Sequence, residues 1–202
     1  MPKLKLKLRQ GNSEAMNLHG PEWKMAPKIG DREVVYQDPY QRIYRVSADF
    51  GAFRKEYFVR DTGHRAGILV LDKGSVLLVR QYRLLINGVS FEIPGGKVEE
   101  GETPEAAASR ECLEEAGIHC RNLRHLMNFH PGLDSLHNPT HIIYTEDWNY
   151  GVNQVSNHSE TTSSVWVPLQ EAVAKVFGEE IVDALSIVAL LSYSAVSEHR
   201  HF

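Results

Sequence analysis

Cysteine is scarce in this chain, which contains only Cys112 and Cys120 among its 202 residues. Two cysteines at this spacing form neither a typical metal-binding motif nor the disulfide framework of a small secreted domain. The scarcity favours a reducing compartment, and both thiols are expected to be buried or idle.

Long apolar runs are also missing. The longest, at 66–71 and 187–196, fall far short of the roughly 20 residues that a membrane-spanning helix requires. Residues 1–10 alternate basic and apolar side chains, and they lack the continuous apolar core of a secretion signal. We therefore expect a cytoplasmic protein without a membrane partner.

An excess of positive charge is likewise absent, because 22 Lys and Arg residues face 26 Asp and Glu residues and leave a net charge of -4. A protein that binds nucleic acid usually carries a basic patch, so nucleic acid is not an expected partner. The 42% hydrophobic content is typical of a globular chain, and its length suits one ample core.

The N-terminal third of the chain shows two different patterns. Residues 1–30 have no stable period, so we expect an arm there, in which the basic residues at positions 3, 5, 7 and 9 have no assigned role. Residues 31–62 contain short segments rich in β-branched and aromatic side chains, at 33–38, 42–49 and 54–61, which predict antiparallel strands. Because the edges of such a small sheet would be exposed, we expect a homodimer built partly on residues 33–60.

Residues 63–202 are expected to form one domain. Two apolar runs flank the turn-forming residues 72–74 and predict a buried hairpin. Further patterns predict strands at 123–131, 140–148 and 165–168, a polar loop at 151–164, and helices at 169–177 and 181–196. Strands and helices mixed without regular alternation favour an α/β sandwich with a mixed sheet over a parallel barrel.

The clearest helix is expected at 104–116, where Thr103 can cap the first turn and Gly117 can end the last one. It carries Glu111, Glu114 and Glu115, whose like charges repel each other on neighbouring positions. A solvated acidic face is one interpretation. The other is a Mg²⁺ site, because this cation prefers oxygen ligands, and a backbone carbonyl at Gly95 could add one. Arg110 would hold the carboxylates in place.

The motif around this helix resembles the Nudix box of the Nudix hydrolases. Gly96 is followed by five residues and Glu102, then by seven residues and Arg110, and then by the sequence ECLEEAGI at 111–118. The one departure is Cys112, where the family usually has a larger aliphatic residue. The resemblance implies a Nudix α/β/α sandwich that hydrolyses a nucleoside diphosphate linked to another moiety. It also implies Glu111 and Glu115 as ligands of Mg²⁺, or of Mn²⁺ in its place, with Glu114 as a further ligand or a water positioner.

Segments outside the box, at 76–83, 91–102 and 176–191, resemble the ADP-ribose pyrophosphatase branch. This resemblance implies ADP-ribose or a related nucleoside diphosphate sugar as the substrate. It places Arg83 at the pyrophosphate and Tyr40 against the adenine, with Arg54 as a further substrate-binding residue. A surface ion pair for Arg83 and core packing for Tyr40 are the alternatives. Pro131 comes slightly early for the branch, and His137 stands where a glutamate would be expected.

The resemblance also implies that the general base comes from the loop at 151–164. Glu160 is the only carboxylate of that loop, so it is the candidate base, and His158 is the alternative. A solvated glutamate without a catalytic role fits the same position. For the whole chain, the other readings are a Nudix pyrophosphatase for another nucleoside diphosphate derivative and a Nudix-fold ligand sensor without turnover.

Overall fold

The computed structural model describes residues 26–151 and 161–198. Glu160, His158 and the basic residues at positions 3–9 lie outside the described residues. The helices are the 3-10 helix η1 (Leu84–Ile86) and the α-helices α1 (Pro104–Ala116), α2 (Leu169–Phe177) and α3 (Ala184–Glu198). The strands are β1 (Lys28–Ile29), β2 (Glu33–Gln37), β3 (Arg42–Asp49), β4 (Arg54–Asp61), β5 (Arg65–Asp72), β6 (Ser75–Arg83), β7 (Gly88–Glu92), β8 (Gly95–Lys97), β9 (Ile118–Arg121), β10 (Arg124–Phe129), β11 (Leu136–His137), β12 (Thr140–Thr145), β13 (Asp147–Tyr150) and β14 (Thr161–Pro168).

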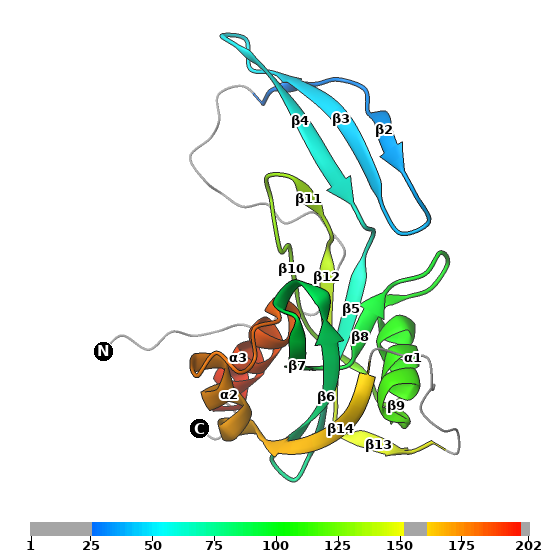
Figure 1. Ribbon diagram of the computed structural model, residues 1–202, viewed down its shortest axis with the longest axis vertical. Coiled ribbons are helices and arrows are strands. Elements are labelled where there is room, and N and C mark those ends of the chain that lie inside the picture. The colour runs from blue at the N-terminus through cyan, green and yellow to red at the C-terminus, as the bar shows by residue number, and fades with distance from the viewer. Residues whose placement is uncertain (1–25, 152–160, 199–202) are drawn as a thin grey trace.

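The chain forms an upper sheet and a larger α/β body below it (Figure 1). The upper sheet has the strand order β1-β3-β4-β11, and β2 also pairs with β3. The main sheet of the body has the order β10-β12-β5-β6-β14, and short strands β7 and β8 pair with β6 and β5. Since β12 runs parallel to β5 while β6 runs antiparallel to it, the sheet is mixed, as the sequence predicts.

Helices cover the main sheet on two sides and make it the middle layer of a sandwich. Alternating residues of β5 and β6 enter two separate cores, because successive side chains of a strand point to opposite faces. One core joins Leu69 and Leu78 to α2 and α3, and the other joins Ile68 and Leu77 to α1. The predicted α/β sandwich is therefore confirmed.

Local chemistry explains the bounds of α1. The Thr103 hydroxyl accepts a hydrogen bond from the Ala106 N–H at 3.2 Å, and Pro104 occupies the first turn. Gly117 ends the helix with a φ of 67°, a left-handed conformation that glycine adopts without a steric cost. The prediction of a helix from 104 to 116 is confirmed at both ends.

Most other predicted elements are present, with a few differences at their ends. The hairpin of β5 and β6 turns through Lys73 and Gly74, which both have a positive φ, as a tight turn between twisted strands requires. The prediction of a loop as far as residue 164 is wrong at its end, because β14 begins at Thr161 and pairs with β6. Helix α3 begins at Ala184 rather than at residue 181, since Asp183 accepts a hydrogen bond from the Ser186 N–H. Among the described residues, no helix is long and apolar enough to cross a membrane.

Candidate active site

Arg110 is the centre of an ionic network on α1. Its guanidinium donates two hydrogen bonds to the Glu102 carboxylate, at 3.0 and 3.1 Å. One amino group also donates to Glu111 at 2.8 Å and to Glu114 at 3.3 Å, and the other donates to the Lys97 carbonyl at 3.0 Å. These carboxylates raise the pKa of Arg110, with the bond to Glu102 as the largest cause. The Arg110 guanidinium thus binds three glutamates and the glycine-rich loop together, as the sequence predicts.

Glu115 lies deeper than the other glutamates, against the sheet. Its carboxylate accepts a hydrogen bond from the Gly95 N–H of β8 at 3.0 Å and another from the Gln81 side chain of β6. Burial raises the pKa of Glu115 to about 7, although the Gly95 N–H works in the opposite direction, and the negative charge of Glu111 adds to the rise. Glu115 is therefore a carboxylate whose negative charge is only partly compensated by its protein neighbours.

Glu111 packs directly against the glycine-rich loop. A side chain at Gly96 would overlap the Glu111 carboxylate, so only glycine leaves room for it. Gly95 has no space for a side chain either, because a Cβ there would meet the Ala66 carbonyl oxygen at 2.6 Å. Burial raises the pKa of Glu111, and its bond to Arg110 opposes that shift. The two glycines thus allow the loop and the acidic face of α1 to approach each other closely.

The acidic residues of α1 have the donor chemistry of a divalent cation site. Carboxylate oxygens are hard ligands, and the partly buried Glu111 and Glu115 repel each other in a way that a cation would relieve. In the described part of the chain, however, no three acidic, histidine or cysteine side chains converge on a single point suited to a metal ion. Arg110 instead supplies the positive charge next to Glu111 and Glu114.

Arg83, predicted to bind the pyrophosphate, lies at the end of β6. Its guanidinium donates to both carboxylate oxygens of Glu92, at 2.7 and 2.6 Å, and Glu92 is only 3% exposed. The Arg83 side chain is partly exposed, and its positive charge lowers the pKa of Glu115. Arg83 therefore forms an ion pair, as the alternative interpretation expects, but the pair is not at the surface because Glu92 is buried. A role at the phosphates stays a prediction.

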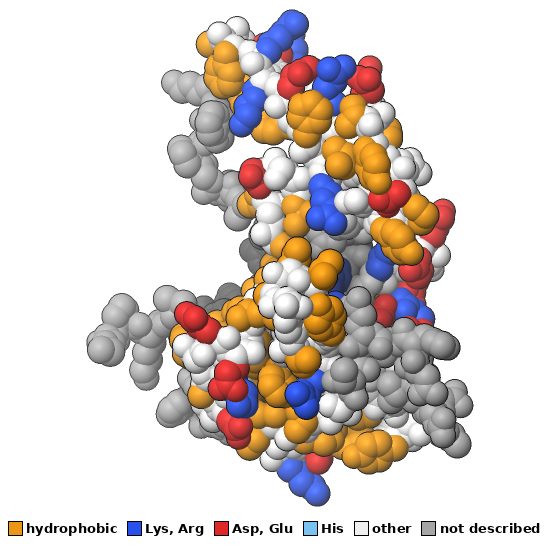
Figure 2. Space-filling view, in the orientation of Figure 1, with side chains coloured by type: hydrophobic (Ala, Val, Ile, Leu, Met, Phe, Trp, Pro, Cys, Tyr) orange, Lys and Arg blue, Asp and Glu red, His pale blue; other side chains and the backbone are white. Residues whose placement is uncertain are grey.

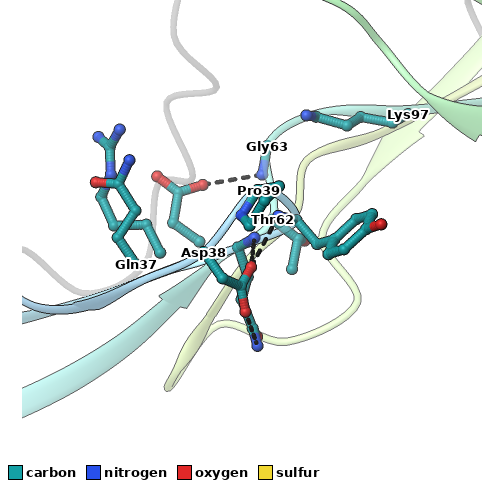
Figure 3. Close-up of a pocket in the computed structure, with 10 residues that line it drawn as sticks. Gln37, Asp38, Pro39, Thr62, Gly63 and Lys97 are labelled. Atoms are coloured by element: carbon teal, nitrogen blue, oxygen red, sulfur yellow. Dashed lines mark hydrogen bonds between the residues drawn. The ribbon is translucent and has the colours of Figure 1, made fainter.

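Tyr40, predicted to stack on the adenine, lies in the turn between β2 and β3 and is 83% exposed. The alternative of core packing is therefore wrong. Tyr40 lines two neighbouring cavities, of about 280 and 370 Å³, which also share Thr62 and Lys97. The smaller cavity is drawn in Figure 3, where Lys97 extends along the turn at Gly63. Because Gly96 lines the larger cavity, the structure brings Tyr40 to the rim of the Nudix-box loop.

Arg54, the third predicted substrate-binding residue, does not join this group within one chain. It begins β4 at the end remote from the cavities, and its side chain is 80% exposed and paired with Asp49 at 3.0 Å. Seven residue steps separate it from Asp61, which lines the smaller cavity. At about 3.3 Å per residue, this is a distance of roughly 23 Å along the strand. A role of Arg54 in substrate binding stays a prediction.

Several residues of the site are absent from the sequence predictions. Gln81 and Glu92 hold Glu115 and Arg83, and both are buried polar side chains in otherwise apolar strands, a signal that the sequence does contain. His137 has a partner that the sequence does not indicate, because its Nδ1 lies 2.8 Å from the Asp61 carboxylate. The strands β11 and β4, which carry the two residues, pair in parallel, a pairing that no local pattern indicates.

Comparisons with known proteins agree with this geometry. The model of the NUDIX domain matches residues 61–185, which is more than half of the chain. The chain is 29% identical over 138 residues to a CMP-5'-(N-acetyl-N-hydroxy-3-aminopropyl)phosphonate hydrolase of Streptomyces rubellomurinus, covering 68% of this chain and 66% of that protein. It is 28% identical over 141 residues to an ADP-ribose pyrophosphatase of Bacillus subtilis, covering 69% of this chain and 76% of that protein.

A solved structure extends the likeness to the fold as a whole. The crystal structure of an ADP compounds hydrolase superposes on this chain with a TM-score of 0.76 at 18% identity. The superposition covers 87% of this chain and 96% of the hydrolase chain. With the box motif, the sandwich and the domain match in agreement, the chain belongs to the Nudix hydrolase family.

Proposed function

We propose that this protein hydrolyses the pyrophosphate bond of ADP-ribose or a related nucleoside diphosphate sugar in the presence of Mg²⁺. The products would be a nucleoside monophosphate and a sugar phosphate. The observation that carries the proposal is the network in which Arg110 binds Glu102, Glu111 and Glu114 beside the partly buried Glu115. The likeness to the ADP-ribose pyrophosphatase of B. subtilis supports the choice of substrate.

In this mechanism the glutamates of α1 and the Gly95 carbonyl would hold the divalent cation. When bound, the cation would supply positive charge against the diphosphate and acidify a water molecule. Arg110 orients Glu111 and Glu114 through charge-assisted hydrogen bonds, which keep both carboxylates in place. The Gly95 N–H and Gln81 fix Glu115 in the same way.

The remaining predicted roles belong to this proposal as well. Tyr40 would stack on the base, because its ring is exposed at the cavity rim. Arg83 would contribute positive charge near the phosphates while it is held by Glu92. Glu160, or His158 in its place, would accept a proton from the attacking water. Both of these last residues lie outside the described part of the chain.

A panel of nucleoside diphosphate substrates tests the proposal directly. Purified protein with Mg²⁺ should convert ADP-ribose to AMP and ribose 5-phosphate, measured by chromatography, and EDTA should abolish the reaction. The variant Glu115→Gln should lower turnover by at least about a hundredfold, the scale of losing a preorganised charge in an active site. Glu171→Gln on the exposed part of α2 is the matched control and should retain full turnover.

The same panel separates two rival functions. Hydrolysis of a CMP-linked or another nucleoside diphosphate derivative in preference to ADP-ribose would move the substrate toward the Streptomyces relative. Binding of these compounds without release of any phosphomonoester would instead identify a ligand sensor. The presence of all the acidic positions of the box favours turnover over sensing.

We also propose a homodimer formed partly through residues 33–60. Apolar side chains gather on the outer surface of the upper sheet (Figure 2). Tyr36 and Phe58 are about half exposed, and they share one face of this sheet because their partners Ile43 and Arg45 lie two residues apart on β3. Apolar surface of this kind in a soluble chain is typical of a protein contact. A second copy would cover it and could also bring Arg54 toward a site that its own chain leaves distant.

A further inference from the structure

The larger cavity beside Tyr40 carries an unusual concentration of positive charge. Its charged lining residues are Arg60, Arg65 and Lys97, and no acidic residue lines it. The remaining lining residues are Tyr40, Thr62, His64, Gly96, Leu136 and Asn138. A hollow of about 370 Å³ with this composition is suited to an anion.

The three basic side chains of this cavity have no acidic partner in the described part of the chain. Arg60, Arg65 and Lys97 each form no ion pair with a described carboxylate, in contrast to Arg83 and Arg110 nearby. The buried Nε of Arg65 also has no hydrogen-bond partner. A buried donor without a partner costs free energy, because it has lost its hydrogen bonds to water. A ligand that accepts hydrogen bonds would remove this cost.

The backbone around Arg65 is firmly held. Its residue lies in β5 between Lys97 of β8 and Thr140 of β12, which are its partners on the two sides of the strand. The Arg65 N–H also donates to the Pro139 carbonyl at 2.9 Å. The strand position that carries this side chain is therefore fixed before a ligand binds, so no backbone ordering is needed there.

The cavity adjoins the acidic face of α1. Gly96 lines the cavity, and the same residue packs against the Glu111 carboxylate. The positive charge of Arg65 acts on Glu111 across this boundary and lowers its pKa, against the larger effect of burial. Cations on one side of Gly96 and carboxylates on the other give the two kinds of contact that a phosphate chain with a divalent cation needs.

We propose that Arg65, Lys97 and Arg60 form a phosphate-binding site for the diphosphate of the substrate. Arg65 would bind a phosphoryl oxygen pair through its planar guanidinium, and Lys97 would add a single point charge. Tyr40 lines the same cavity, so the nucleoside part of the bound substrate would lie next to the Tyr40 ring. This inference rests on the proposed function and deepens it, because it assigns phosphate recognition to residues outside the Nudix box.

Binding of ADP to the full chain in EDTA, measured by isothermal titration calorimetry, tests the site without turnover and without a metal ion. Arg65→Gln should weaken ADP binding by about tenfold or more, and Lys97→Gln by about fivefold, as expected for the loss of a charged hydrogen-bond donor. Arg65→Lys should recover part of the affinity. Lys73→Gln, in the distant hairpin turn, removes the same charge and should leave the affinity unchanged.

Adenosine is the control ligand, and its affinity should change by less than about twofold in every variant because it carries no phosphate. Unchanged ADP affinity in both Arg65→Gln and Lys97→Gln would overturn the proposal, as would an equal loss for adenosine or no binding of ADP to the wild type. Lys97 is exposed, so its variant decides the question if Arg65→Gln fails to fold. Absence of ADP-ribose hydrolysis with this ADP binding pattern intact would reject only the proposed function.

Discussion

At the scale of single residues, the site depends on one arginine and on glutamates in two different environments. Arg110 holds the half-exposed Glu114 and the less exposed Glu102 and Glu111, whereas the partly buried Glu115 is held by the backbone of β8 and by Gln81. Arg110 lowers the pKa of Glu102, and it opposes the rise that burial causes in the pKa of Glu111. For Glu115, burial is the largest cause and raises the pKa to about 7. The two environments lead to separate predictions.

Arg110→Lys tests whether the planar guanidinium is required. A lysine keeps the charge but cannot bind Glu102 with two donors while also reaching Glu111 and the Lys97 carbonyl. Turnover should fall by about tenfold to a hundredfold, because misplaced catalytic groups have costs on this scale. The free energy of unfolding should fall by about 1–3 kcal/mol for the lost charged hydrogen bonds. Steady-state kinetics and chemical denaturation would measure both effects, and wild-type values for both would contradict the assigned role.

Glu115→Gln should stabilise the metal-free protein at neutral pH. The folded protein raises the pKa of Glu115 from 4.5 to about 7, so the folded state binds a proton more tightly than the unfolded state. Stability from this group is therefore present below pH 4.5 and is lost as the pH rises toward 7. A neutral glutamine avoids the loss, and the gain at pH 8 should be on the order of 2 kcal/mol.

Thermal unfolding in EDTA at pH 5 and at pH 8 provides the measurement. The variant should be more stable than the wild type at pH 8, and the difference should shrink at pH 5. Glu171→Gln, which removes an exposed carboxylate, should show no such dependence. An equal or larger stabilisation by Glu115→Gln at pH 5 would count against the buried, partly uncompensated charge.

At the scale of elements, the close approach of α1 and the glycine-rich loop defines the site. Small residues face the sheet from the helix, namely Ala107, Ala108 and Cys112, and all of them are buried. Cys112 is smaller than the aliphatic residue usual in the family, and it packs in the same core as Cys120, as expected for a thiol without a chemical role. The loop contributes the second close surface through Gly95 and Gly96.

Gly96→Ala should disrupt this contact at its tightest point. The new methyl group would overlap the Glu111 carboxylate and force it away from Arg110. Turnover should fall by about tenfold to a hundredfold, because a shift on the order of 1 Å in an active site has effects of that size. Gly88→Ala is the matched control, since its nearest contact would be an ordinary one at 3.6 Å. Equal turnover in the two variants would show that Glu111 has more freedom than the structure indicates.

At the scale of the whole molecule, the upper sheet and the α/β body meet around the two cavities. The chain leaves β4 of the upper sheet and enters β5 of the main sheet through residues 62–64, so Thr62 and His64 lie at the junction and line a cavity. Tyr40 lines both cavities from the turn between β2 and β3. The upper sheet therefore takes part in the candidate substrate site as well as in the proposed dimer.

Size-exclusion chromatography with light scattering should show a homodimer at micromolar protein concentration. The double variant Tyr36→Lys with Phe58→Lys places charges on one exposed apolar face and should shift the protein to a monomer, because burying an unpaired charge is costly. Phe177→Lys, on an exposed side chain at the end of α2, is the control and should leave the dimer intact. A wild-type monomer would exclude the proposed contact.

The sequence by itself determined the features that depend on neighbouring residues. Thr103, Pro104 and Gly117 set the ends of α1 through contacts within a few residues, and the tight turn at Lys73 and Gly74 likewise sets its own hairpin. The box motif belongs to the same class, because its glutamates and Arg110 lie on adjacent turns of one helix. Side-chain periodicity also indicated which strands are buried, and hence the α/β sandwich.

Only the tertiary structure decided which distant residues meet. Gln81 binds Glu115 across 34 residues, and Asp61 contacts His137 across 76 residues. The ion pair of Arg83 with Glu92 and the position of Arg65 beside Lys97 both depend on strand register. Register follows from the packing of whole sheets, since a shift by one residue would turn every side chain of a strand to the opposite face. A local sequence pattern does not indicate the strand register, so the positively charged cavity is visible only in the folded chain.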